Sequence, residues 1–438
     1  MSDERVGAGI DGLAQTLPIA SHPLRAALSE EMHLRKFPRI AAPSCMLQVM
    51  TLVQEDGGGR SLAHLQGLCD QYGVASPADG RYFACRLGTV DFVWERHTEA
   101  VSYTFIQPGG PERSFGPEGF DEVAREWMRD LPGEVIRATQ IVLLGRGTAA
   151  DDEQLARSWF SGDDLVVCDV ADGRARIWSD FRLHHNGFGR LLIFDKELVG
   201  HEAARLVQRL QELGNYRNMA MLGLPLAQRL TPEVSRLEQR LVALTEATSE
   251  RRSDDAVLLA ELGSMSAELA RLMAETRYRM SATHAYAQLC SDRLQSLKVG
   301  EVRGYDTLVD FTERRLVPAM RTCDSFSRRL EDLSQRVAWT SSLLRTRVDT
   351  SLAVQNRDLL HSMDERTRLQ LRLQQTVEGL SVVAISYYMV GLASYLFKGA
   401  HAYLPVFQPE VAVGITVPLM VLLAALALRR VHRKLVHC

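Results

Sequence analysis

The chain has 438 residues, of which 24% are charged, and its formal net charge is −3. This near-neutral balance argues against a nucleic-acid-binding protein, and the length allows two or three structural units with a substantial core. The seven cysteines are widely spaced and include no C-x-x-C pair, so they predict neither a zinc ribbon nor a disulfide framework.

The N-terminal half predicts one layered domain. Residues 1–43 are mixed in character and interrupted by prolines, with one short helix expected over residues 22–37. Residues 44–195 consist mainly of short apolar runs bounded by Gly, Asp and Pro, which are typical of strands. Helical stretches at residues 60–73 and 120–131 interrupt them. We expect an α/β layer domain with a largely antiparallel sheet, and therefore an α+β fold for the whole chain.

The stretch WERHTEAVSYTF, residues 94–105, reads as one strand. Alternate residues of a strand share a face, which would put Glu95, His97 and Glu99 in a row. Two carboxylates and an imidazole are suitable ligands for a divalent cation. The alternative is the solvated face of an antiparallel strand. Four residues span about 13 Å along a strand, so one ion could bridge Glu95 and Glu99 only if the strand bulges.

Enzyme motifs give little support to catalysis. No P-loop, dinucleotide-binding, zinc-protease or serine-hydrolase motif occurs in a credible context. The adjacent His184 and His185 precede an Asn-Gly hairpin signal and would point in opposite directions on a strand. We therefore expect no catalytic residues, and the only cofactor suggested is a divalent cation at the strand face described above.

Residues 196–300 predict a helical subdomain. Thr231-Pro232-Glu233 indicates a helix start with Thr231 as the N-cap. In the following helix, apolar residues recur at spacings of four and three and predict a packing seam. The residues of this seam are Leu258, Leu262, Met265, Leu269 and Leu272.

Residues 301–379 predict a long stalk helix. A three-four rhythm of apolar residues runs from Leu316 to Leu344, which is the pattern of a coiled coil between copies of the chain. Residues 319–378 contain no Gly or Pro, so the helix could continue directly into the next segment. About 60 residues at 1.5 Å each give a stalk of roughly 90 Å. The alternative is a helical bundle folded back on itself.

The C-terminal segment, residues 380–428, predicts a transmembrane hairpin. Residues 380–397 and 411–428 carry no charge, and each run is near the lower length limit for a spanning helix. The alternative is a pair of buried core helices. Basic residues precede the first run and fill the tail at residues 429–438, whereas the linker has only Lys398. By the positive-inside rule, both termini should be cytoplasmic and the lipid bilayer should be a partner.

Several polar residues occur in the first expected span, residues 380–397. In a homo-oligomer they could line a pore, whereas the alternative is helix packing through small residues and hydroxyl groups. The pore-lining candidates are Ser386, Tyr387, Gly391, Ser394 and Tyr395.

Several segments resemble a bacterial family of uncharacterised membrane-anchored proteins with a domain of unknown function. The most specific is LQQTVEGLSVVAISYYMVGL, and the others include WERHTEAVSYTF and RLVQRLQELGNYRNMAMLGLP. The stretch HLRKFP departs from the shorter His-Ala-Arg-Pro-type stretch of that family. The resemblance implies a location in the bacterial inner membrane and implies no reaction.

The overall layout also resembles CorA-type metal-ion channels, which are pentamers whose first span lines the pore. The Gly-Met-Asn tripeptide that ends their first span is absent, and residues 394–399 read SYLFKG instead. Lys398 near the pore mouth would repel cations. The resemblance in layout implies a homo-oligomeric, CorA-like channel, transporter or ion sensor. The alternative is a membrane-anchored binding or scaffold module that transports nothing and whose cytoplasmic ligand is unknown.

Overall fold

The computed structural model describes residues 22–26, 28–29, 37–53, 58–77, 80–109, 115, 127–128, 130–145, 147, 149–160, 164–250, 254–401 and 409–435. The chain divides into two compact units, Met1–Ala247 with Glu261–Ala338, and Thr248–Ala260 with Trp339–Cys438. Most of the helix expected over residues 120–131, and half of the one expected over residues 22–37, lies outside the described residues.

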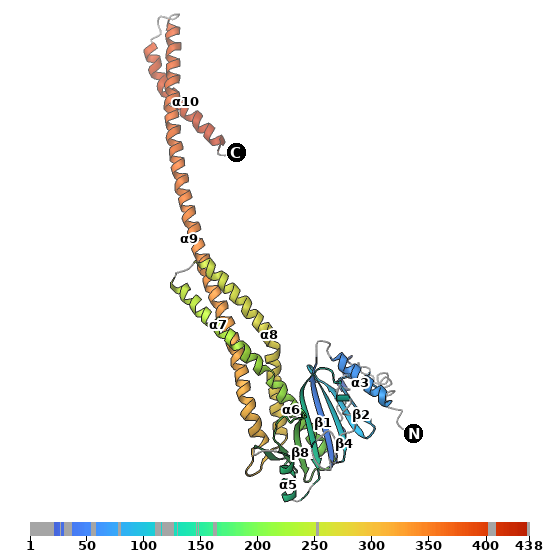
Figure 1. Cartoon of the computed structure of the whole chain (residues 1–438). Helices are drawn as coiled ribbons and strands as arrows, with labels where there is room; N and C mark the ends of the chain where they lie inside the picture. The colour runs from blue at the N-terminus through green and yellow to red at the C-terminus, as the bar shows by residue number, and fades with distance from the viewer. Residues whose placement is uncertain are drawn as a thin grey trace. The chain divides into compact units, whose positions relative to one another are not determined.

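Within the described residues, nine strands form one sheet in the order β2-β3-β4-β1-β5-β8-β7-β6-β9 (Figure 1). Neighbouring strands are antiparallel except for β5 and β8, which are parallel. The predicted largely antiparallel sheet is therefore confirmed. The strands are β1 (Ser44–Leu52), β2 (Tyr82–Leu87), β3 (Val90–Arg96), β4 (Ala100–Pro108), β5 (Glu134–Leu144), β6 (Val166–Val170), β7 (Ala175–Ser179), β8 (Gly189–Asp195) and β9 (Gly300–Glu301).

The two halves of the sheet share one strand order. From the centre outward, the first half runs β1-β4-β3-β2 and the second runs β5-β8-β7-β6. The buried Trp94 of β3 and Trp178 of β7 therefore lie on corresponding strands. Strand direction differs, because β1 and β4 are antiparallel whereas β5 and β8 are parallel. The halves thus repeat an order of strands but not their directions.

Residues 94–105 form a hairpin, so the expectation of a single strand was wrong. β3 ends at Arg96, β4 begins at Ala100, and the backbone N–H of His97 donates to the carbonyl of Ala100 at 2.8 Å. The turn contains no Gly, Pro or Asn, so it lacks the usual hairpin signals. As a consequence, Glu95 lies on β3 while His97 and Glu99 lie in the turn.

One face of the sheet carries an aromatic core. Helices α3 (Gly59–Tyr72) and α5 (Ala149–Trp159) pack on this face through residues such as Leu65 and Ala156. The aromatic side chains of this core that are almost fully buried are Phe92, Trp94, Tyr103, Phe105, Trp178 and Phe194. α3 matches the helix expected over residues 60–73.

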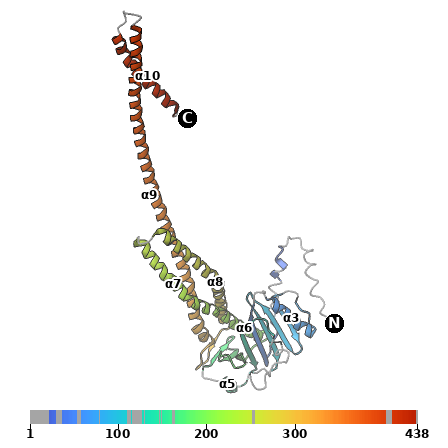
Figure 2. The ribbon, with the colours of Figure 1, turned by 45° about the horizontal axis from the view of Figure 1, so that its top comes forward.

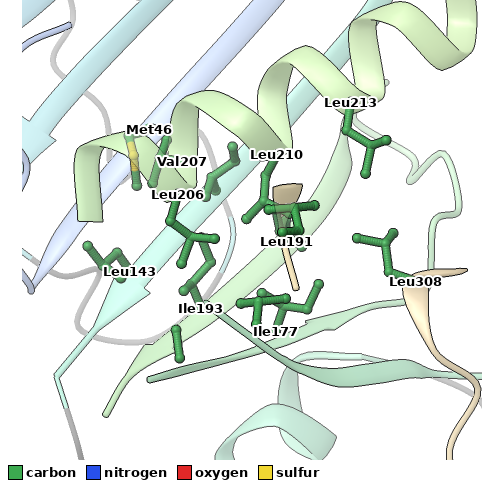
Figure 3. Close-up of a cluster of buried hydrophobic side chains, with 14 of the residues drawn as sticks. Met46, Leu143, Ile177, Leu191, Ile193, Leu206, Val207, Leu210, Leu213 and Leu308 are labelled. Atoms are coloured by element: carbon green, nitrogen blue, oxygen red, sulfur yellow. The ribbon is translucent and has the colours of Figure 1, made fainter. Parts of the chain in front are cut away.

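The opposite face is covered by α6 (Glu202–Met221). Its apolar side chains Leu206, Leu210 and Leu213 belong to the same core as Leu191 and Ile193 of β8 (Figure 3). Since successive strand residues point to opposite faces, one strand supplies both cores. In β8, Leu191 and Ile193 meet α6, whereas Leu192 and Phe194 meet the aromatic core.

The segment between helices α8 (Asp255–Ser296) and α9 (Leu308–His401) completes the sheet. Gly300–Glu301 forms β9 and pairs with β6. The backbone N–H of Val167 also donates to the carbonyl of Asp306 at 3.0 Å. The sheet therefore includes residues far beyond the domain boundary expected near residue 195.

The helices after α6 differ from expectation at one start signal. α7 (Gly223–Glu250) already contains Thr231 and Pro232, so the prediction of a helix start at Thr231 was wrong. The Thr231 hydroxyl donates to the carbonyl of Ala227 at 2.6 Å, one turn earlier, instead of capping a new helix. A proline inside a helix removes one backbone hydrogen bond, and packing of the surrounding helix compensates.

α7, α8 (Asp255–Ser296) and the first part of α9 (Leu308–His401) lie side by side (Figures 1 and 2). Arg329 of α9 pairs with Glu238 of α7 at 2.7 Å, and His284 of α8 lies 3.1 Å from Asp324 of α9. The seam predicted in α8 is buried as expected. The apolar seam of α9 is buried within the single chain. The expectation that this seam pairs with other copies of the chain is therefore corrected. The buried residues of the seam are Leu316, Cys323, Phe326, Leu330, Leu333, Val337 and Leu344.

α9 is one unbroken helix of 94 residues, so the folded-back alternative for the stalk is wrong. Thr307 and Asp310 cap its start, because the Thr307 backbone N–H donates to the Asp310 carboxylate at 3.0 Å and the Asp310 N–H donates to the Thr307 hydroxyl at 3.1 Å. Within the described chain, Leu308–Leu396 is long and apolar enough to cross a membrane, and Val413–Ala427 of α10 (Pro409–Leu435) is a shorter apolar helix. The two-helix transmembrane hairpin stays a prediction.

The close approach of α7 and α8 at Gly223 yields a test of bundle packing. A Cβ atom at position 223 would lie 2.4 Å from Oγ1 of the buried Thr283, so Gly223→Ala should lower the free energy of unfolding by about 1–3 kcal/mol. Gly263→Ala in α8 is the matched control, because no atom lies within 4 Å of its added Cβ. Thermal unfolding followed by circular dichroism should show a lower midpoint for the first variant only. Equal midpoints would contradict the close packing.

Candidate functional site

The structure separates the three residues expected to share a strand face. His97 Nε2 lies 3.8 Å from Glu95 Oε2, whereas Glu99 forms a two-point ion pair with Arg279 of α8, at 2.6 and 3.1 Å. Arg279 therefore neutralises Glu99 and ties the β3–β4 turn to α8. Among the described residues, no group of three or more His, Cys, Asp or Glu side chains is placed to hold a metal ion. Metal binding by this trio stays a prediction.

The space beside Glu95 and His97 is small. α6 covers it with Gln208, Gln211 and Asn215, and the enclosed volume is about 20 Å³. That volume is enough for about one water molecule and too small for an organic substrate. The adjacent His184 and His185 have different surroundings. His184 Nε2 lies 3.1 Å from Asp180 Oδ2, whereas His185 is exposed.

The candidates in the apolar part of α9 do not share one face. Ser386 is 5% exposed, whereas Tyr387 and Tyr395 are more than three-quarters exposed. Ala393, two turns after Ser386, is buried as well, so these two residues mark the covered side of the helix. Gly391 and Ser394 have intermediate exposure. The lining of a pore by Tyr387, Gly391, Ser394 and Tyr395 stays a prediction, and Ser386 lies on a different face.

A cavity with a volume of about 450 Å³ lies between the sheet and α6. β5 begins at Glu134, but β8 pairs with it only from Thr139 onward, opposite Gly189. The first residues of β5 consequently have no β8 neighbour, and the cavity occupies this gap. Its lining residues are Val135, Ile136, Arg137, Ala138, Thr139, Ile177, Ser179, Phe181, Arg182, Leu183, Gly187, Gly189, Arg190, Leu191, Leu210, Leu213, Gly214, Arg217, Asn218 and Leu308.

A β-bulge shapes the β5 wall of the cavity. Arg137 pairs with Met50 of β1 and Val135 pairs with Thr51, so Ile136 is the extra residue. The Ile136 carbonyl accepts a hydrogen bond from Nδ2 of Asn218 on α6, at 3.2 Å. Bulges bend a strand and redirect its side chains, and they are common beside functional sites. Here the bulge is adjacent to Arg137.

Arg137 is held between β5 and α6 by neutral groups. Its Nη1 donates to Oε1 of Gln48 and, at 3.1 Å, to Oδ1 of Asn215. A Cβ added at Gly214 would lie 2.5 Å from Nε and Nη2 of Arg137, so the guanidinium group lies directly against the α6 backbone. Burial, together with the nearby charge of Arg217, lowers the pKa of Arg137 to about 9. The group therefore remains charged at neutral pH.

Arg217 supplies a second guanidinium group to the same cavity. Its charge lies over the ring of Phe181, 4.8 Å from the centroid, and near that of Phe311 on α9, at 5.4 Å. The two rings stack with centroids 4.3 Å apart. In the described structure, the Arg217 N–H groups make no hydrogen bond. Burial lowers the pKa of Arg217, and the charge of Arg315 acts in the same direction.

Phe181 holds an uncommon backbone conformation. Its φ angle is +50°, in the left-handed region that non-glycine residues seldom adopt. Such strain persists where surrounding contacts fix it, and it is frequent at ligand-binding sites. Here the contacts that fix Phe181 are Phe311 and Arg217.

No acidic residue is among the described residues that line the cavity. The guanidinium groups of the other two lining arginines have their contacts outside the cavity. Arg182 pairs with Asp164 at 3.2 Å, and the Arg190 guanidinium lies over Phe115 on the opposite face of the sheet. The arrangement of Arg137 and Arg217 can therefore bind an anion through open N–H donors.

Reasoning from sequence did not select Arg137 or Arg217. Arg137 alternates with apolar residues in a strand and Arg217 follows a charged helical stretch, so both patterns are those of solvated positions. One signal was present: Gly214 lies inside a strongly helical run, where glycine usually needs a packing reason.

The contact between Gly214 and Arg137 yields a second test. Gly214→Ala should lower the free energy of unfolding by about 1–3 kcal/mol, because the new methyl group displaces the guanidinium from Gln48 and Asn215. This loss should appear although alanine favours a helix by about 1 kcal/mol over glycine.

Two controls separate this effect from helix propensity. Gly67→Ala in α3 adds a methyl group with no atom within 4 Å and should not destabilise the protein. Adding Arg137→Ala to Gly214→Ala removes the clash, so the two changes should be strongly non-additive in urea unfolding. Additive effects would show that the methyl group acts elsewhere.

Comparison with protein families identifies the chain. The model of a family described as "Protein of unknown function (DUF3422)" matches residues 20–435, so the chain belongs to this family. The resemblance to a family with a domain of unknown function is thereby confirmed. No curated protein matches the sequence. The family description names no activity, so function is argued from the cavity.

Proposed function

We propose that this member of the DUF3422 family is a membrane-attached receptor that binds a small organic anion between Arg137 and Arg217. This proposal develops the binding-module alternative of the sequence analysis. The observation that carries it is the presence of two guanidinium groups with open N–H donors in one cavity whose described lining has no acidic residue.

The energetics of burial favour a ligand of opposite charge. A buried or half-buried cation without a carboxylate partner is costly, and arginine is rarely found inside a protein unless it is paired. A carboxylate or phosphate group would receive charge-assisted hydrogen bonds from the planar guanidinium edges. The cavity volume of about 450 Å³ also falls in the usual range for small-molecule sites.

Membrane attachment is part of this proposal. The apolar end of α9 and the apolar helix at Val413–Ala427 support two spans. The basic residues before the first span and in the tail support a cytoplasmic location for both termini, and hence for the cavity. The resemblance to a bacterial family favours the inner membrane.

Anion binding should depend on Arg217. Titration calorimetry of the full-length protein in detergent should show saturable binding of at least one of inorganic phosphate, hexanoate and hexyl phosphate. Replacing Arg217 by Met should weaken that binding about 10- to 100-fold, as expected for the loss of hydrogen bonds from a charged group. Arg205→Met, an exposed position of the same helix, is the matched control.

Two results would overturn the receptor. One is the absence of binding for all three anions. The other is equal affinity in the protein with Arg217→Met and in the control.

A CorA-like channel is the second candidate, and two observations favour it. α9 continues without a break into its apolar end, and Tyr387 and Tyr395 are exposed there. If this segment lines a pore in a homo-oligomer, then changing Tyr387 and Gly391 to leucine should abolish ion flux in proteoliposomes. The thermal midpoint should not change. Flux that is absent from both proteins, or equal in both, would reject the pore.

A further inference from the structure

We infer that the anionic group bound in the cavity carries two negative charges, as a phosphate monoester does, and that it is attached to an apolar body. This inference rests on the proposed receptor function and adds the chemical class of its ligand. Three features carry it, namely the charge of the cavity, the orientation of the two arginines and the character of the remaining walls.

The first feature is the charge balance. Arg137 and Arg217 bring two positive charges, and the partners of Arg137 are the neutral amides of Gln48 and Asn215. A third positive charge lies close to Arg217, because Arg315 lies over the ring of Phe311, at 4.1 Å from its centroid, and lowers the pKa of Arg217. An anion with one charge would leave one guanidinium group uncompensated at low dielectric, whereas a dianion would neutralise both.

The second feature is the orientation of the N–H donors. Gln48 and Asn215 accept hydrogen bonds from Nη1 of Arg137, whereas its Nε and Nη2 make no hydrogen bond to a described residue and lie beside Gly214 in the lining of the cavity. Arg217 packs against aromatic rings, which contact the flat face of a guanidinium group and leave its edge open. Two guanidinium edges supply several N–H donors, and the oxygens of a phosphate group match this pattern bidentately.

The third feature is the apolar wall. Leu210 and Leu213 of α6, Ile177 of β7 and Leu308 of α9 line the cavity and belong to the core on this face of the sheet (Figure 3). Leu183 also lines the cavity and is 77% exposed. The four core side chains are at most 5% exposed, so the apolar surface open to a ligand is that of exposed lining residues such as Leu183, which an apolar ester group would cover.

The charge inference can be tested without changing the protein. Hexyl phosphate takes up its second negative charge near pH 6, whereas hexyl sulfate carries one charge at both pH 5 and pH 8. The described lining contains no Asp, Glu, His or Lys, and Arg137, with its pKa of about 9, stays mostly protonated across this range. Hexyl sulfate, whose own charge is constant, reports any change of charge in the cavity itself, including at Arg217, and the additional pH dependence of hexyl phosphate belongs to the ligand.

We expect calorimetry of the full-length protein to show hexyl phosphate binding at least tenfold more tightly at pH 8 than at pH 5. At pH 8 it should also bind at least tenfold more tightly than hexyl sulfate, which should show little pH dependence. Arg217→Met should reduce the preference for phosphate over sulfate, because one positive charge is then left. Arg205→Met should keep that preference.

The outcomes separate this inference from the receptor proposal. If hexyl phosphate and hexyl sulfate bind with equal affinity, and Arg217→Met abolishes the binding of both, then the inference of a doubly charged ligand is wrong and the proposed receptor function stands. If inorganic phosphate binds as tightly as hexyl phosphate, the inference that the ligand has an apolar body is wrong. Absence of binding for every anion would overturn the receptor as well.

A phosphate monoester could be a soluble metabolite or the head group of a lipid. The cavity volume of about 450 Å³ favours a soluble ester. Competition between hexyl phosphate and vesicles that contain phosphatidic acid distinguishes the two sources. Displacement of hexyl phosphate by these vesicles, but not by vesicles of phosphatidylcholine alone, would assign the site to lipid and overturn the soluble ester.

Discussion

Two positive charges held in one cavity, whose described lining includes no carboxylate, are the constraint around which this sheet domain is arranged. Local irregularities of the backbone coincide with them. Ile136 is the extra residue of a bulge, Phe181 has a positive φ angle, and Gly214 replaces a side chain inside α6. Each departure places or accommodates Arg137 or Arg217. Natural sequences depart from regular geometry mainly where function requires it, and here several departures meet at one place.

The interface between α6 and the sheet divides into two parts with different tasks. Leu206, Leu210 and Leu213 belong to the apolar core, which stabilises the docking of the helix. Gln211 and Asn215 are equally buried but face polar residues of the sheet, including Gln48. The polar part contributes less to stability, because buried polar groups only recover what they lose by leaving water. Within it, Gln48 and Asn215 hold Arg137 in position.

Sequence patterns predicted regular structure better than they predicted the site. The alternating strands, the α8 seam and the unbroken α9 follow from periodicity, which local sequence encodes. The turn at His97–Glu99 was missed because it has no residue with special backbone preferences, and the strand β9 was missed because its pairing is long-range. Arg137 and Arg217 were missed for a related reason. A charged residue at an alternating position looks solvated until the tertiary fold shows that a helix covers it.

The pairing of β9 with β6 has a consequence for where the chain can be divided. An uncovered edge strand exposes backbone donors and acceptors that readily add strands from other molecules. Gly300–Glu301 and the carbonyl of Asp306 occupy this edge of β6, although they follow the sheet by more than a hundred residues in sequence. A fragment that ends after β8 or α6 would leave β6 open and invite aggregation. The smallest soluble piece of this sheet domain should therefore extend through the start of α9.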